Sequence, residues 1–95
     1  MSFESRRGRV VEFIEEYHDG CWNLQTADAN GLVERVAENV MAYHDIKPVS
    51  SSRTMYVLAV REALELGQLN WRTAYGSDNM SLMICTREFV EGLSE

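Results

Sequence analysis

The sequence has one proline, two cysteines and no long apolar run, and each scarcity excludes a class of protein. No stretch approaches the roughly 18 consecutive apolar residues that a transmembrane helix needs, so we expect a soluble chain without membrane partners. The basic start of the chain is not followed by an apolar segment, which argues against a secretory signal peptide. We therefore expect a cytoplasmic location and two reduced thiols, Cys21 and Cys85, rather than a disulfide.

Basic residues are also scarce. The chain has 9 Lys and Arg against 15 Asp and Glu, which gives a formal net charge of −6. Affinity for a phosphate backbone depends on Lys and Arg, so binding to nucleic acid requires that the few basic side chains gather on one face. The same acidic balance suits a partner protein with a basic surface.

No motif of catalysis or metal binding is recognisable in the sequence. The chain contains neither a P-loop nor a nucleophile elbow. Neither cysteine lies in a sequence motif that would pair it with a histidine for nucleophilic catalysis. The acidic residues around His18, namely Glu12, Glu15, Glu16 and Asp19, are typical of a solvated helix face rather than of ligands that converge on an ion. We therefore predict no enzyme activity, no cofactor and no metal site.

What remains is the composition of a small globular domain. The chain has 95 residues, of which 45% are hydrophobic and 25% charged, so we expect a single domain over residues 1–95. A domain of this size has a small core, and a homodimer would add buried surface to it.

Three segments, at about residues 3–18, 31–43 and 53–66, have the periodicity of amphipathic helices. The residues expected on their buried faces are Val10, Phe13, Ile14 and Tyr17; Leu32, Val33, Val36, Val40 and Tyr43; and Tyr56, Val57, Val60, Ala63 and Leu64. We predict that Asp28 or Asn30 caps the second helix, and that a serine among residues 50–52 caps the third. Gly67 is expected to end the third helix in the C′ position.

The last thirty residues have two interpretations. Apolar and polar side chains alternate over residues 69–75 and again over 80–86, with a Gly-Ser-Asp-Asn turn between them, which predicts a β-hairpin. Alternatively, Asp78 caps a fourth helix with a buried stripe of Leu82, Cys85, Phe89 and Leu93. The expected fold is therefore helix-rich α+β, with three helices, a C-terminal β-hairpin and a short terminal helix. The alternative is an all-α domain of four helices.

Two segments carry a resemblance to a known family. They are residues 49–56 (Val-Ser-Ser-Ser-Arg-Thr-Met-Tyr) and residues 61–69 (Arg-Glu-Ala-Leu-Glu-Leu-Gly-Gln-Leu). With the order of elements over residues 9–86, they resemble the winged helix-turn-helix, in which a recognition helix begins with Ser-Arg-Thr and ends in a leucine–glycine–leucine pattern before the wing. The spacing here, Leu64, Gly67 and Leu69, is one residue shorter than in that pattern.

The resemblance implies that the protein binds double-stranded DNA as a regulator and that the start of the third helix enters the major groove. It further implies that one arginine of the wing reaches a flanking phosphate. The DNA-contacting residues so implied are Ser51, Ser52, Arg53, Thr54 and Arg61, with Arg72 in the wing.

A second hypothesis is an acidic helical module that binds a basic protein, as phage- or plasmid-type inhibitors and adaptors do. The acidic residues that motivate it are Glu12, Glu15, Glu16, Glu62, Glu65, Glu88 and Glu91. Large apolar residues outside the predicted helix faces are candidates for an interface with a protein partner or a second copy, although both tryptophans could instead close the ends of the core. These residues are Trp22, Trp71, Tyr75, Phe89, Val90 and Leu93.

Overall fold

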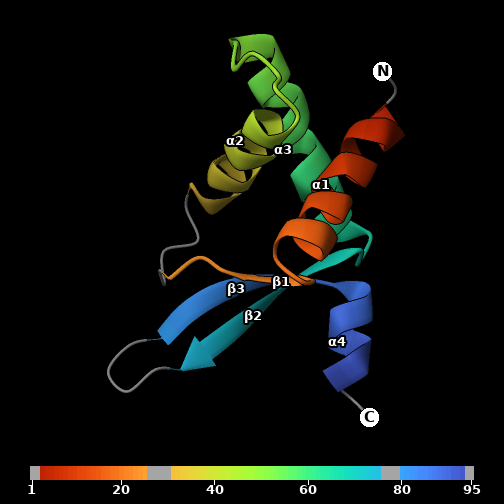
Figure 1. Ribbon diagram of the computed structural model, residues 1–95, viewed down its shortest axis with the longest axis vertical. Helices are drawn as coiled ribbons and strands as arrows, with labels where there is room; N and C mark the ends of the chain where they lie inside the picture. Colours follow the sequence, from red (N-terminus) through yellow and green to blue (C-terminus); the bar gives the residue numbers. More distant parts are fainter. Residues whose placement is uncertain (1–2, 26–30, 76–79, 94–95) are drawn as a thin grey trace.

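The elements follow in the order helix, strand, two helices, β-hairpin and a final short helix. The computed structural model (Figure 1) describes residues 3–25, 31–75 and 80–93, with their side chains except at residues 3–5, 74, 75 and 80. The described elements are α1 (Phe3–Tyr17), β1 (Cys21–Asn23), α2 (Leu32–Tyr43), α3 (Ser50–Glu65), β2 (Leu69–Tyr75), β3 (Met80–Thr86) and α4 (Arg87–Leu93). This is a small α+β fold, so the predicted hairpin and short terminal helix are confirmed and the all-α alternative is wrong.

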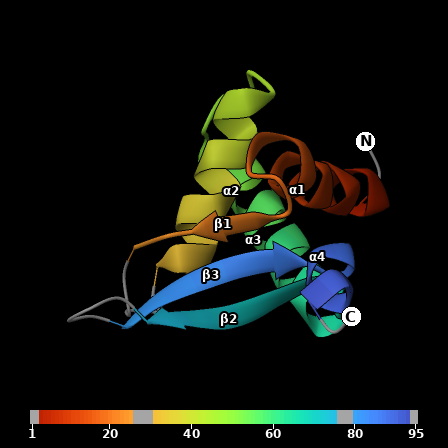
Figure 2. The same ribbon diagram turned by 60° about the horizontal axis from the view of Figure 1, so that its bottom comes forward.

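Helices α1, α2 and α3 form one layer, which lies on one side of the sheet (Figures 1 and 2). Helix α4 continues from the end of β3 and points away from that layer (Figure 1). The core lies between the helical layer and the sheet, because the apolar stripes of all three helices and the inner face of the sheet meet there. Its largest fully buried apolar side chains are Ile14, Leu24, Met41, Leu69, Ile84, Val10, Val36, Val40 and Val60.

The sheet has the strand order β1-β3-β2, with both neighbouring pairs antiparallel. Ile84 at its centre is opposite Trp22 of β1 and Trp71 of β2, so these three side chains share one face. Ile84 is fully buried and both tryptophans pack against the core. That face is therefore the inner one, and the residues that alternate with these three point to the outer face.

Helix α3 ends as predicted at Gly67, which has a positive φ of 74°. The amide of Gln68 donates to the carbonyl of Ala63 at 2.9 Å, and the amide of Gly67 donates to that of Leu64 at 3.2 Å. These two bonds form a Schellman motif, in which glycine is favoured because a Cβ is strained at positive φ. The guanidinium of Arg87 then donates to the carbonyls of Leu66 and Gly67, at 2.7 and 3.1 Å.

The predicted serine cap of α3 is wrong. The helix begins at Ser50, its N-cap residue is Val49, and the cap makes no side-chain hydrogen bond. The hydroxyl of Ser52 instead donates back to the carbonyls of Lys47 and Val49, at 2.6 and 3.0 Å. Ser52 is already inside the first helical turn, so its hydroxyl meets the preceding carbonyls and not the free amides. The N-cap of α2 is Gly31, and the predicted caps Asp28 and Asn30 lie outside the described residues.

The turn after α1 depends on Gly20, which has a φ of 87°. A Cβ at this position would lie 3.3 Å from both Cβ of Phe89 and Oγ1 of Thr86. We expect Gly20→Ala to lower the free energy of unfolding by about 1–3 kcal/mol, because it combines left-handed strain with crowding against α4. The measurement is urea unfolding followed by circular dichroism.

Gly8→Ala is the matched control. Gly8 lies within α1, and a Cβ there meets no other atom within 4 Å. This substitution should raise the free energy of unfolding by about 0.5–1 kcal/mol, since alanine is the better helix former. Equal effects of the two substitutions would contradict the role assigned to the turn at Gly20.

Candidate functional site

Helix α3 has one face that no other described element covers. Its opposite face is buried through Tyr56, Ala59, Val60 and Ala63, where it packs against α1, α2 and the sheet. The exposed residues recur every three or four positions, which places them in one stripe along the helix. The stripe consists of Ser51, Thr54, Leu58, Arg61 and Glu65, and Leu58 in its middle is 45% exposed.

The residues that the resemblance implied for DNA contact are only partly brought together. Ser51, Thr54 and Arg61 lie in the exposed stripe. Ser52 is half-buried and directs its hydroxyl to carbonyls of the preceding loop. Arg53 forms an ion pair with Glu38 of α2, with 3.2 Å between its Nε and the carboxylate.

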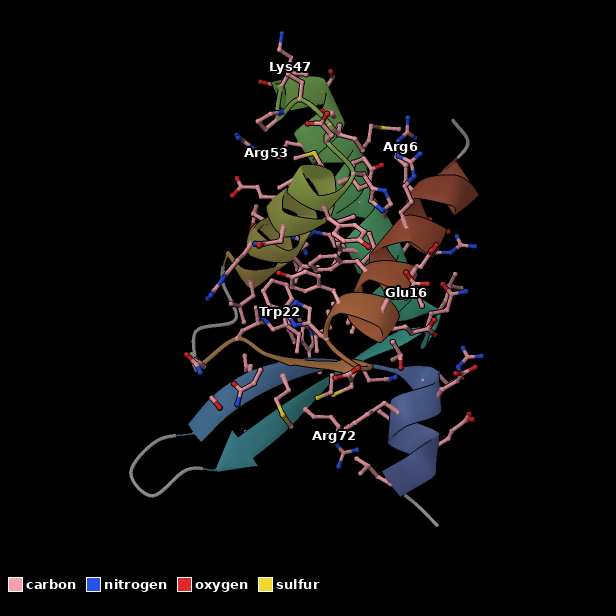
Figure 3. All side chains as sticks on the ribbon, viewed as in Figure 1. Arg6, Glu16, Trp22, Lys47, Arg53 and Arg72 are labelled. Carbon is pink, nitrogen blue, oxygen red and sulfur yellow. The ribbon has the colours of Figure 1, made fainter. Side chains whose placement is uncertain are left out.

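Arg72 is separated from the start of α3. It lies on β2, and Figure 3 shows it on the far side of the sheet from the helical layer, at the opposite end of the molecule from Arg53. Trp71 is part of the inner face, so its neighbour Arg72 points outward. A single straight duplex could contact both residues only by following the molecule along its length.

Most of the basic side chains stabilise the fold itself. The intramolecular partners of five of them are Glu62 for Arg7, the hydroxyl of Tyr56 for Arg9, the carbonyl of Leu24 for Arg35, Glu38 for Arg53, and the carbonyls of Leu66 and Gly67 for Arg87. The remaining four, Arg6, Lys47, Arg61 and Arg72, form no ion pair or side-chain hydrogen bond with the described residues. Figure 3 shows Lys47 and Arg6 towards one end and Arg72 at the other.

The first turn of α3 is nevertheless suited to an anion. It contains no acidic residue, and no side chain caps its free amides. The positive end of the helix dipole and these amides attract phosphate groups. Lys47, three residues before the helix, is exposed and adds a positive charge to this end.

Carboxylates gather elsewhere, in two open grooves between α1 and α4. The carboxylates that line the first groove are Glu12, Glu15 and Glu16 of α1 and Glu88 of α4. Arg7 and Arg87 also line it, but each is bonded to another group, Arg7 to Glu62 and Arg87 to the carbonyls that follow α3. The second shares Glu15 and Glu88 with the first and adds Asp19. We call this surface the acidic groove. It includes four of the acidic residues named in the protein-binding hypothesis, together with Asp19.

An aromatic cluster covers the junction of α1, β1 and α2. The rings of Phe13, Tyr17, His18, Trp22 and Tyr43 lie 4.4–5.9 Å apart in successive stacked or edge-on contacts. The predicted burial of Tyr17 and Tyr43 is wrong, because 64% and 51% of these residues are exposed. Both are the last residues of their helices, beyond the region where the apolar faces meet.

The predicted interface residues occupy different environments. Trp22 and Trp71 are half-buried and pack against the core. Phe89 and Val90 of α4 are half-buried, and Leu93 is 55% exposed. The side chain of Tyr75 lies outside the described residues. The exposed rings of Tyr17 and Tyr43 could not be recognised from the sequence, since both fit the helical stripe.

Neither a metal centre nor a membrane span is evident in the described ranges. No group of three or more His, Cys, Asp or Glu side chains among these residues could hold a metal ion. No helix of the described chain combines the length and the apolar character that crossing a bilayer requires.

The aromatic cluster gives stability a pH dependence through His18. Its imidazole stacks on the indole of Trp22, with ring centroids 4.4 Å apart. Burial lowers the pKa of His18 from 6.5, and the carboxylate of Asp19 opposes this shift. Because the folded state then binds the proton less well than the unfolded state, stability falls as the pH drops below about 6.5 and levels off below the folded pKa.

We predict that His18→Gln flattens the dependence of the free energy of unfolding on pH between about pH 7 and pH 5. Urea unfolding at half-unit pH steps measures this dependence, and carboxylates contribute mainly below this window. An unchanged slope in the variant would show that His18 does not carry the pH dependence.

Comparison with known proteins identifies no relative of this chain. No protein-family model, no curated protein and no solved structure matches the chain. Any functional assignment therefore rests on the residues of this chain and on their arrangement.

Proposed function

We propose that this protein is a non-enzymatic, winged-helix-like regulator that binds double-stranded DNA through α3. The observation that carries the proposal is the order of elements together with the order of strands. A helix, a strand, two helices and a hairpin follow one another, and β1 pairs with the far strand of the hairpin, β3. This arrangement supports the winged-helix resemblance, with α3 as the recognition helix and β2 and β3 as the wing.

The exposed stripe of α3 supplies side chains that suit a DNA groove. The hydroxyls of Ser51 and Thr54 can donate to phosphates or base edges, and the guanidinium of Arg61 can bind a guanine or a phosphate. Leu58 offers an apolar contact for a thymine methyl group. The uncapped start of α3 adds backbone amides for a phosphate.

Few cations are available for this contact, so each protomer would bind weakly and with a small dependence on salt. A homodimer that places two α3 helices one helical turn of DNA apart would raise the affinity without more basic residues.

The first test is titration of the protein into labelled duplex DNA at low and moderate salt. We expect Ser51→Asp and Arg61→Glu each to weaken binding about tenfold or more. The carboxylate introduced by Ser51→Asp would repel phosphate, and because a negative charge stabilises the N-terminal end of a helix, this loss would not come from unfolding. The substitution of Arg61 removes one phosphate or base contact. Arg61→Glu should also make the salt slope shallower by about one unit.

Arg6→Glu is the control with the same change in charge. Arg6 belongs to α1 and is not part of the exposed stripe of α3. It should retain nearly wild-type affinity, and thermal unfolding of each variant reports on the fold. The proposal is overturned by an absence of any complex at low salt, or by an equal loss in Arg6→Glu and Arg61→Glu.

The acidic groove favours a second candidate function, a module that binds a basic protein. The carboxylates of Glu12, Glu15, Glu16 and Glu88 line one continuous open surface, so they can engage several cationic side chains of a partner together. Complementary charge of this kind increases the association rate and selects the partner.

For this candidate we expect Glu12→Lys/Glu16→Lys to lose protein partners that the wild type captures in a pull-down. The control, Glu34→Lys/Glu38→Lys, makes the same change in net charge at exposed positions of α2, away from the acidic groove. Partners retained by both double variants would count against the acidic groove, and partners lost by both would indicate a response to net charge alone.

A further inference from the structure

Two cysteines distant in sequence face each other across the outer side of the sheet. Cys21 of β1 and Cys85 of β3 are register partners, and their sulfur atoms lie 2.6 Å apart. Cys85 follows the inward-facing Ile84, so both thiols point to the face opposite the helical layer. The sulfur of Met83 lies 3.6 Å from that of Cys21. Both cysteines are free thiols in this structure.

The position in the ladder favours a bond between these sulfurs. The amide of Leu24 donates to the carbonyl of Leu82, and the amide of Thr86 donates to that of Gly20. Hydrogen-bonded pairs alternate with non-hydrogen-bonded pairs along an antiparallel ladder, so Cys21 and Cys85 form a non-hydrogen-bonded pair. Such pairs have the closer side chains, and a disulfide needs a further approach of only about half an ångström.

The two thiols differ in access. Cys21 is partly exposed, whereas Cys85 is fully buried. Burial, and next the hydrogen bond with Cys21, raises the pKa of Cys85 to about 12, and the guanidinium of Arg72 opposes this shift. A soluble reagent therefore meets Cys21 first, and Cys85 is held in contact with the sulfur that has reacted.

We propose that Cys21 and Cys85 form a reversible cross-strand disulfide by exchange with a low-molecular-weight disulfide of the glutathione class. The thiolate of Cys21 attacks one sulfur of the reagent, which forms a mixed disulfide and releases the first reagent thiolate. Cys85 loses its proton to solvent and attacks the sulfur of Cys21, which forms the internal bond and releases the second thiolate. Two protein thiols are oxidised by two electrons, and one reagent disulfide is reduced to two thiols.

The bond would fix a weakly held part of the fold. Strand β1 is three residues long, and it connects α1 to the hairpin through its pairing with β3. A disulfide at this pairing closes the chain from residue 21 to residue 85, which restricts the unfolded ensemble strongly. Oxidation therefore stabilises the folded chain and adds no charge to its surface.

The test treats the reduced full-length protein with oxidised glutathione and follows it by intact mass and peptide mapping. We expect the chain to lose the mass of two hydrogen atoms and to yield one linked pair of peptides that contains Cys21 and Cys85. The thermal midpoint should rise by roughly 10–20 °C, and dithiothreitol should reverse both changes. Closure should accelerate as the pH rises, because Cys85 must ionise.

Two variants and one condition sharpen the test. Cys85→Ser should stop at a glutathione adduct on Cys21, and Cys21→Ser should react slowly in the folded state. In concentrated guanidinium chloride the wild type should yield adducts and little internal bond, because the fold no longer holds the thiols together. Circular dichroism checks the fold of both variants, and the wild-type peptide map does not depend on them.

Three outcomes would overturn the proposal. They are a stable glutathione adduct on wild-type Cys21, a disulfide between two chains, and retention of both free thiols in the folded protein. Each would show that the contact between the sulfur atoms does not lead to an internal bond.

Discussion

The close packing of α3 against α1, α2 and the sheet is the interaction on which the rest of the structure depends. Ala59 and Ala63 are fully buried on its inner face, and their small side chains let the neighbouring helices approach the α3 backbone. Val60 and Tyr56 fill the space on either side of this contact. Because one face of α3 is committed to the core, its other face must remain exposed, so the same constraint creates the stripe from Ser51 to Glu65.

The ends of α3 connect this packing to the sheet. The Schellman motif at Gly67 reverses the chain, so that β2 begins at Leu69, whose side chain is fully buried. Arg87 completes the turn by donating to its last carbonyls, and it is the first residue after β3. The beginning of α4 and the end of α3 are thereby joined through one side chain. The cost is that this arginine is not available for a phosphate.

The sequence predicted the helices and the hairpin because periodicity and glycine placement are local properties of the chain. It failed where tertiary contacts decide the outcome. Tyr17 and Tyr43 fit their helical stripes, but they lie where those helices extend beyond the core. The pairing of Arg53 with Glu38, and of Cys21 with Cys85, joins residues on different elements, and no local pattern encodes either contact. Ser51, Thr54 and Arg61 do lie on one exposed helix face, whereas their contact with DNA stays a prediction.

The net charge of −6 is compatible with a phosphate contact only if the unpaired carboxylates lie far from it, since Glu38, beside the start of α3, is paired with Arg53. The acidic groove reaches α3 at Gln68, just beyond its C-terminal end, whereas Ser51 lies in the first turn. At 1.5 Å per residue this separation is about 25 Å, well beyond the Debye length of about 8 Å at physiological salt. Repulsion from the groove is therefore largely screened at the start of α3 and strongest near Glu65. It follows that Ser51, Thr54 and the free amides are the better phosphate contacts, and that Arg61 lies at the boundary between the two surfaces.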